Sequence, residues 1–343
     1  MNLYREFLKE WSEKWFEIIS DKLTTSQIHS CWFLNKNPNI TWEIVQANPD
    51  KDWCYDYLSL NPNITWEIVQ SNPDKPWNYC NLSFNPNITW KIVQENPDKD
   101  WNYSLLGKNP NITWKTIQAN PNKFLNYYYA ISSNPNITWE IVQANPKKSW
   151  NYQELSRSLN ITWDIVQANP DKDWEYHWLS SNPNITWEIV QANPDKPWNY
   201  SWLSINPNIT WEIVQANPDK PWNYNTLCRN KNITIDIIKS SPNFVNWITE
   251  FGLNPNITLE IIQNHPTKYQ NGNLLENVSD DDWDIDMLCM NEMTLERNNY
   301  IRNKFQEWFR RSDLKAELMA NVWHPRNFEK FRYLDPETFG EEF

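Results

Sequence analysis

Glycine is scarce in this 343-residue chain, which contains only four. They are Gly107, Gly252, Gly272 and Gly340, each isolated from the others in sequence. Phosphate-binding loops and the nucleophile elbow of hydrolases need glycines a few residues apart, because the backbone there turns sharply or approaches the ligand. The chain therefore has no Walker-type, G-x-G-x-x-G or G-x-S-x-G motif, and we expect no enzyme activity.

Cysteine and histidine are also few and scattered. The five cysteines form no C-x-x-C pair, and the four histidines have no metal-ligand spacing: Cys31, Cys54, Cys80, Cys228, Cys289, His29, His177, His265 and His324. Zinc sites and disulfide frameworks depend on such spacings. We expect idle or buried thiols in a reducing compartment, with no metal and no cofactor.

Basic residues are outnumbered, 31 Lys and Arg against 43 Asp and Glu, which gives a formal net charge of −12. Nucleic acids and anionic membranes attract proteins with a basic footprint, so neither is the expected partner. No hydrophobic run reaches the length of a membrane span, and the opening MNLYREFLKEWSEKW has no apolar core of a signal peptide. We expect a soluble, cytoplasmic protein.

Internal repetition and tryptophan, 24 residues, are what the chain has in abundance. The unit NPNITWEIVQANPDKPWNY recurs every 24 residues, with one extra residue in the fourth unit. Eight clear units and two degenerate ones begin at Asn37, Asn61, Asn85, Asn109, Asn134, Ser158, Asn182, Asn206, Asn230 and Asn254. A fixed period of this length is the signature of a stacked repeat architecture.

Each unit predicts two short helices. In the second unit, Thr65 is placed to cap a helix over residues 66–71, and Pro73 follows its end. Asp74 then caps a second helix that runs to Leu82. Helices this short are unstable alone and need neighbouring units to bury their apolar faces. The sequence therefore predicts an all-α fold, an α-solenoid of about ten two-helix repeats, drawn out into a rod or superhelix of about 100 Å.

The ends of the chain differ from the array. Residues 1–36 have apolar residues at helical spacing and are expected to form an N-terminal helical cap, and 37–278 form the array. Residues 279–343 are expected to form a C-terminal helical cap and an acidic tail. The cap would cover the terminal apolar face of the array, and a docking element is the alternative.

Two motifs imitate known sites. Every unit contains N-x-T, as in Asn63-Ile64-Thr65, but the threonine is needed as a helix cap, so we interpret the asparagine as a turn residue and expect no glycosylation. The acidic residues from Asp280 to Asp286 imitate the opening of a calcium loop. Methionine occupies the positions where that loop needs glycine and glutamate, so a helix start is the better interpretation.

Tryptophan forms two columns, one at the sixth and one at the seventeenth position of the units. The first interpretation is packing between repeats. The second is an exposed aromatic strip that binds peptide, glycan or single-stranded nucleic acid. The regular lysine column at the fifteenth position follows an acid or amide in most units, so little positive field remains for nucleic acid.

The phrase NPNITWEIV resembles the leucine-rich variant repeat, which implies a solenoid of short helices. The full unit and the tail MANVWHPRNFEKFRYLDPETFGEEF more closely resemble repeat proteins encoded by giant nucleocytoplasmic DNA viruses. This resemblance implies a viral protein, in the host cytoplasm or the virion, without implying an activity. Variant-repeat proteins can carry an iron–sulfur cluster ahead of the array, but only Cys31 lies there, so we expect none.

The twentieth and twenty-first positions vary while their neighbours barely change. Solenoids bind along one face, often through aromatic anchors, so the candidate partner-binding residues are Tyr57, Trp178 and Trp202. We expect Trp178 and Trp202 about 10 Å apart, as on adjacent helix layers. The expected function is a non-catalytic protein-interaction scaffold. A self-assembling structural protein of a virion or viral factory is the alternative, and a single-stranded nucleic-acid binder is the weaker one.

Overall fold

The computed structural model describes residues 3–21, 23, 32–241, 243, 250–264, 269–270, 273–274 and 285–311. These residues are helical apart from turns and one short ladder, in which β1 (Tyr269–Gln270) and β2 (Asn273–Leu274) pair antiparallel. The predicted all-α repeat solenoid is confirmed.

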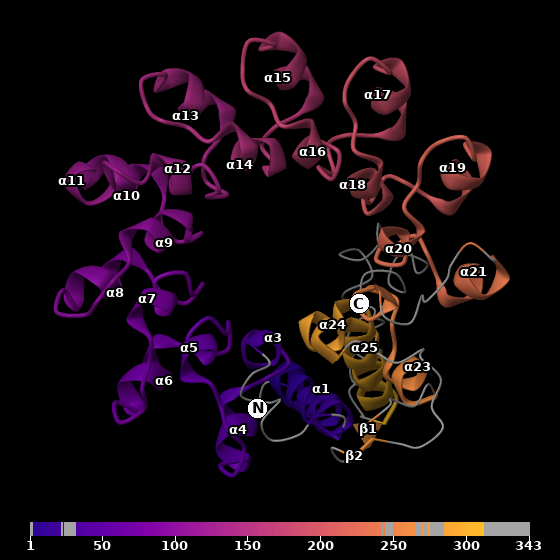
Figure 1. Cartoon of the computed structure of the whole chain (residues 1–343). Helices are drawn as coiled ribbons and strands as arrows, with labels where there is room; N and C mark the ends of the chain where they lie inside the picture. The colour runs from indigo at the N-terminus through magenta and orange to yellow at the C-terminus, as the bar shows by residue number, and fades with distance from the viewer. Residues whose placement is uncertain are drawn as a thin grey trace, which may run out of the picture.

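Two concentric rows of helices make up the array (Figure 1). The outer row comprises α4 (Trp42–Ala47), α6 (Trp66–Ser71), α8 (Trp90–Glu95), α10 (Trp114–Ala119), α13 (Trp139–Ala144), α15 (Trp163–Ala168), α17 (Trp187–Ala192), α19 (Trp211–Ala216), α21 (Ile235–Ser240) and α23 (Leu259–Asn264). The inner row comprises α3 (Trp32–Lys36), α5 (Tyr55–Leu58), α7 (Tyr79–Leu82), α9 (Tyr103–Lys108), α12 (Tyr128–Ile131), α14 (Tyr152–Arg157), α16 (Tyr176–Leu179), α18 (Tyr200–Ser204), α20 (Tyr224–Leu227) and α24 (Ile285–Met290).

The outer helices begin where the sequence predicts. Thr65 is extended and its side chain accepts a hydrogen bond from the backbone N–H of Ile68, which caps α6. The inner helix of the same unit begins later than predicted, at Tyr79, and is capped by Asn78 instead of Asp74. The reason lies in Trp77, whose indole N–H donates to the carbonyl oxygen of Asn72 (2.9 Å) and holds the intervening residues in a turn.

A buried asparagine at the first position joins every unit except the sixth, which has Ser158 there, to the unit before it. The Nδ2 of Asn61 donates to the carbonyl oxygens of Asn35, Asn37 and Ile40, at 2.9, 3.0 and 3.1 Å. Its Oδ1 accepts from the N–H of Asn63 (2.8 Å). Buried backbone carbonyls need such partners, because an unsatisfied polar group costs free energy. The first-position asparagine therefore links neighbouring units by hydrogen bonds.

The asparagine of N-x-T forms a second ladder. The Nδ2 of Asn63 donates to the carbonyl oxygens of Pro38 and Ile40 in the preceding unit, at 2.7 and 2.9 Å. We predicted a turn residue bonded to its own backbone, and this is wrong for the third position: the first asparagine makes the turn and the third binds the neighbour. An amide engaged in this way is not free to carry a glycan.

The two tryptophan columns interleave. Trp77 lies between Trp42 and Tyr55 of the preceding unit, with ring centroids 5.6 and 5.1 Å apart. The same pairing recurs, for example between Trp187 and Trp222 (5.3 Å). Tilted and edge-on pairs at these distances are the favourable arrangement for aromatic rings. The packing interpretation of the columns therefore holds, although the columns pair with each other and do not stack separately.

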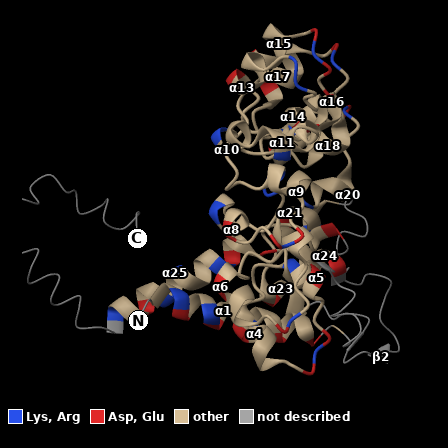
Figure 2. Cartoon of the chain, turned by 90° about the vertical axis from the view of Figure 1, so that its left-hand side faces the viewer, with Lys and Arg blue, Asp and Glu red and all other residues tan. Residues whose placement is uncertain are grey.

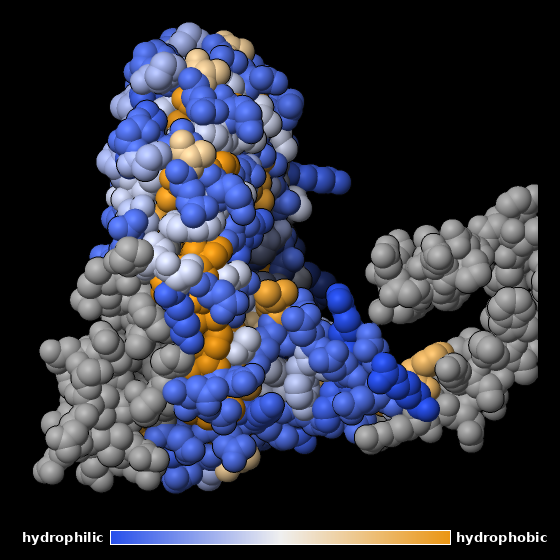
Figure 3. All heavy atoms as spheres, turned by 90° about the vertical axis from the view of Figure 1, so that its right-hand side faces the viewer, coloured by the Kyte–Doolittle hydropathy of each residue, from blue (hydrophilic) through white to orange (hydrophobic). Residues whose placement is uncertain are grey.

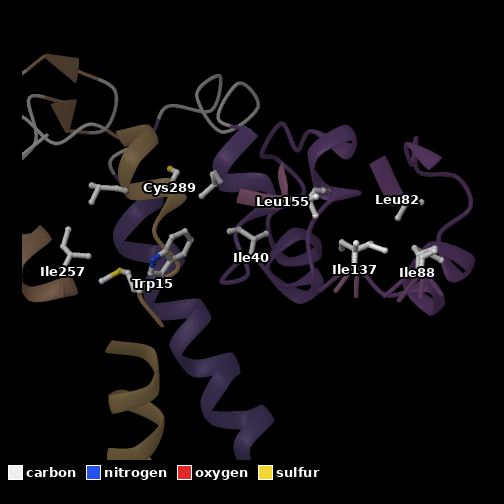
Figure 4. Close-up of a cluster of buried hydrophobic side chains, with 14 of the residues drawn as sticks. Trp15, Ile40, Leu82, Ile88, Ile137, Leu155, Ile257 and Cys289 are labelled. Atoms are coloured by element: carbon white, nitrogen blue, oxygen red, sulfur yellow. The ribbon is translucent and has the colours of Figure 1, made fainter. Parts of the chain in front are cut away.

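The array closes into a ring, so the expected elongated rod or superhelix is wrong (Figure 1). α3 contacts both α5 and α24, so the inner row is continuous across the junction. Figure 4 shows Trp15 and Cys289 near Ile40 and Ile257, and all four belong to one buried cluster. The small rotation between successive units accumulates around the array until its two ends meet.

The closing unit is assembled from both ends of the chain. Its outer helix, α25 (Thr294–Arg311), is C-terminal and its inner helix, α3, is N-terminal. Asn291 stands at the first position and donates to the carbonyl oxygens of Gly252 and Asn254, both at 2.9 Å. The turn that follows is one residue shorter than in N-P-N-I-T, and Met293 accordingly adopts a positive φ of 47°.

The helices α1 (Leu3–Ser20) and α25 pack antiparallel and project from the ring on the side away from α16, α18 and α20 (Figure 2). Phe7 meets Phe305 edge-on (5.0 Å), and Glu10 binds Lys304 (2.6 Å). The terminal helices cover the end units, as caps do, but they cover both ends jointly.

Candidate interaction surface

The inner helices carry the two variable positions of the repeat. The twentieth residue is exposed in several units, including Asp56, Gln153, His177 and Asn225. It also touches the next unit: the Nδ2 of Asn78 donates to Asp56 (2.9 Å), and that of Asn199 lies 3.2 Å from the Nδ1 of His177. Variation at this position therefore changes the inner surface of the ring and leaves the hydrogen bonds of the first-position asparagines intact.

Trp178 and Trp202 come together on α16 and α18. Their ring centroids are 4.9 Å apart with an interplanar angle of 53°. This is closer than the predicted spacing of helix layers, because the side chains lean toward each other across the gap between the helices. Both are half-buried, in contrast to the buried Trp187 of the repeated phrase.

Two residues that sequence reasoning missed complete this group. The His177 ring lies 5.1 Å from Trp178 and 4.9 Å from Trp202, and the guanidinium carbon of Arg157 lies 4.1 Å from the Trp178 ring centroid. We call Arg157, His177, Trp178 and Trp202 the aromatic cluster. Arg157 occupies the twenty-fourth position of its unit, which varies among units as much as the twentieth and twenty-first positions do. That variation is the sequence signal for Arg157.

Tyr57 does not belong to this cluster. It is half-buried on α5, which lies across the ring from α16 and α18 (Figure 1). The three predicted residues thus divide into a pair in contact and a distant single residue.

The fourth unit also departs locally from the repeat. Phe124 at the end of the short helix α11 (Pro121–Phe124) takes the place of the seventeenth-position tryptophan, since it packs on Trp90 (5.7 Å). The residues after it accommodate the insertion, and Leu125 and Tyr129 are left 61% and 63% exposed.

The lysine column is largely neutralised, as expected. Its members pair with the preceding aspartate in five units, at 2.6–3.2 Å: Lys75, Lys99, Lys172, Lys196 and Lys220. The hydrogen bond to Asp74 raises the pKa of Lys75, and the reciprocal bond lowers the pKa of Asp74. Lysines paired in this way contribute little to a phosphate-binding groove.

The described residues contain no group of three or more His, Cys, Asp or Glu side chains that could hold a metal ion. Cys54, Cys80, Cys228 and Cys289 form no disulfide among the described residues, and burial raises the pKa of Cys228 to about 12. Cys228 replaces the serine found at this position in most of the clear units and donates to the carbonyl oxygen of Tyr224 (3.3 Å). Cys31, the other three histidines and the acidic run up to Asp284 lie outside the described residues.

The outer surface is mostly hydrophilic on the side shown in Figure 3, where hydrophobic residues gather in a narrow strip. Within the described ranges, no helix combines the length and the apolar character needed to cross a bilayer. Comparisons with protein-family models, with curated proteins and with solved structures gave no match.

Proposed function

We propose that this protein is a non-catalytic, ring-shaped scaffold that binds a protein partner through the aromatic cluster on its inner helices. The observation that carries the proposal is the contact between Trp178 and Trp202, at the one place where two adjacent units both have tryptophan at the twenty-first position.

The recurrent and the variable positions of the repeat have different structural roles, which supports this proposal. The recurrent asparagines, serines and tryptophans bind neighbouring units, so their conservation from unit to unit follows from ring assembly. No unit other than theirs has tryptophan at the twenty-first position, and Trp178 and Trp202 are only half-buried. Aromatic side chains that combine partial exposure with a large contact area are typical anchors of protein interfaces.

A structural protein that assembles with itself is the competing proposal, favoured by the exposed Trp308 and Phe309 near the end of α25. Single-stranded nucleic-acid binding is weaker, because the seventeenth-position tryptophans are paired and the lysines bind aspartates. We further propose a giant-virus origin on the repeat phrase and the tail sequence alone.

The test is an affinity purification from infected or expressing cells, with the Trp178→Ala/Trp202→Ala double variant beside the wild-type protein. Tyr129→Ala is the matched control, because it removes an exposed aromatic residue of another inner helix. We expect a specific protein to be lost with the double variant and retained with the control. Identical protein partners for all three baits would contradict the proposal, as would co-purification of nucleic acid alone.

A further inference from the structure

Arg157 has the same place in its unit as Arg229, and the two differ in what they face. Arg229 binds Glu250, 21 residues further along the chain, through its Nε (2.6 Å). The residue 21 positions after Arg157 is Trp178, and the guanidinium of Arg157 stacks over that ring. The repeat geometry that pairs Arg229 with a carboxylate therefore places Arg157 on an aromatic ring, with no carboxylate paired to it among the described residues.

The Arg157 side chain is exposed and pairs with no carboxylate in the part of the chain that the structure describes. Glu154, one turn earlier on α14, forms no ion pair with it there either. A guanidinium stacked on an indole keeps the N–H donors at its edge available, and stacking reduces the entropy lost when they bind a carboxylate. The guanidinium N–H donors of Arg157 are thus available to bind an anion of another molecule.

We propose that the aromatic cluster recognises an acidic peptide segment, in which one carboxylate binds Arg157 and a neighbouring aromatic side chain packs on Trp178 and Trp202. This inference rests on the proposed function and names the chemistry of the partner. The carboxylate supplies what Glu250 supplies to Arg229, and the two half-buried indoles supply the apolar contact.

The charge around the cluster selects a peptide over a polyanion. The chain carries a net charge of −12, and Glu175, exposed at the start of α16, lies next to the cluster in sequence. A single guanidinium in such surroundings attracts one carboxylate, whereas a row of phosphates would be repelled by the remaining charge. An acidic peptide with one anchoring side chain is the occupant that meets both conditions.

The test measures binding of two capped synthetic peptides, Gly-Glu-Phe-Glu-Gly and Gly-Lys-Phe-Lys-Gly, by calorimetry and by the indole N–H signals of the full-length protein. We expect binding of the acidic peptide only, weakened at least about 10-fold by Arg157→Gln, since a hydrogen bond between charged groups is lost. Arg229→Gln is the matched control, because it removes the equivalent arginine, which already has a carboxylate, and should leave the affinity unchanged.

Trp178→Phe, which keeps an aromatic ring, distinguishes lost contacts from a lost fold and should bind at reduced affinity with an unchanged unfolding midpoint. Equal affinity for both peptides, or no effect of Arg157→Gln, overturns the inference. Tighter binding of oligothymidylate than of the acidic peptide overturns it as well. If the double tryptophan variant loses its cellular partner while the acidic peptide fails to bind, the scaffold proposal stands and only the acidic-peptide inference falls.

Discussion

Asn37 and Asn291 are 254 residues apart in the chain, yet the Nδ2 of Asn37 donates to the carbonyl oxygen of Asn291 (3.1 Å). The same amide donates to the carbonyl oxygen of Cys289 (2.7 Å). These are the bonds that Asn61 makes to its preceding unit. The two ends of the chain therefore join by the same interaction that joins the internal units, apart from the junction at Ser158.

Removing the amide of Asn37 should weaken ring closure. Asn37→Ala deletes the hydrogen bonds to the carbonyl oxygens of Cys289 and Asn291 and the one accepted from the N–H of Asn39, and it leaves buried polar groups unpaired. We expect a loss of about 2–3 kcal/mol in the free energy of unfolding, measured in urea. A change within error would mean that closure does not contribute to stability.

Placing an asparagine at position 158, the first position of the sixth unit, should stabilise the ring. Ser158 replaces the first asparagine of the sixth unit, and its Oγ accepts only the local N–H of Asn160 (3.2 Å) among the described residues. Ser158→Asn should add bonds to the carbonyls of the fifth unit and raise the free energy of unfolding by about 1 kcal/mol. A lower unfolding midpoint would show that this junction has a different geometry.

Two threonines allow a matched test of helix capping. The Oγ1 of Thr186 accepts the N–H of Ile189 (3.4 Å), whereas Thr162, at the same position, makes no such bond. Thr186→Ala should cost about 1 kcal/mol of unfolding free energy, and Thr162→Ala clearly less. Equal losses, measured by the same denaturant titration, would assign the threonine's contribution to something other than capping.

The repeated tryptophans should be structural. Trp187 is 6% exposed and packs on Trp222 of the next unit. Trp187→Ala should therefore cost about 3–5 kcal/mol, the usual range for deleting a buried aromatic side chain. Trp178→Ala should cost clearly less, because that side chain is half-exposed. Comparable thermal unfolding midpoints for the two variants would contradict the distinction between ring-forming residues and those proposed to bind a partner.

Glu296 should make the stability of the ring sensitive to pH. Burial raises its pKa above the usual value, while the hydrogen bond from the N–H of Leu259 (2.8 Å) acts in the opposite direction. A carboxyl whose folded-state pKa is raised contributes stability that is present below its unfolded pKa and is lost as pH rises through the raised value. Glu296→Gln should remove that loss as the pH rises above the usual glutamate pKa of about 4.3. Parallel stability curves for wild type and variant over this range would refute the assignment.

The sequence by itself determined the repeat, its all-helical character and the outer helices. Each of these depends on residues close together in the chain, such as Thr65 before its helix and Pro73 after it, and local sterics and capping suffice to place them. The same reasoning missed the start of the inner helix at Tyr79, because Trp77 is held in a turn by a hydrogen bond that the spacing does not reveal.

Only the tertiary structure decided that the array closes and which variable residues meet. Closure depends on a small rotation per unit, summed over the whole array, and no single unit shows the sum. The cluster at Trp178 likewise depends on Arg157 of the preceding unit and Trp202 of the following one. Sequence placed Trp178 and Trp202 at a variable position, but the contact between their rings depends on the packed ring. The same holds for the absence, among the described residues, of a carboxylate paired with Arg157.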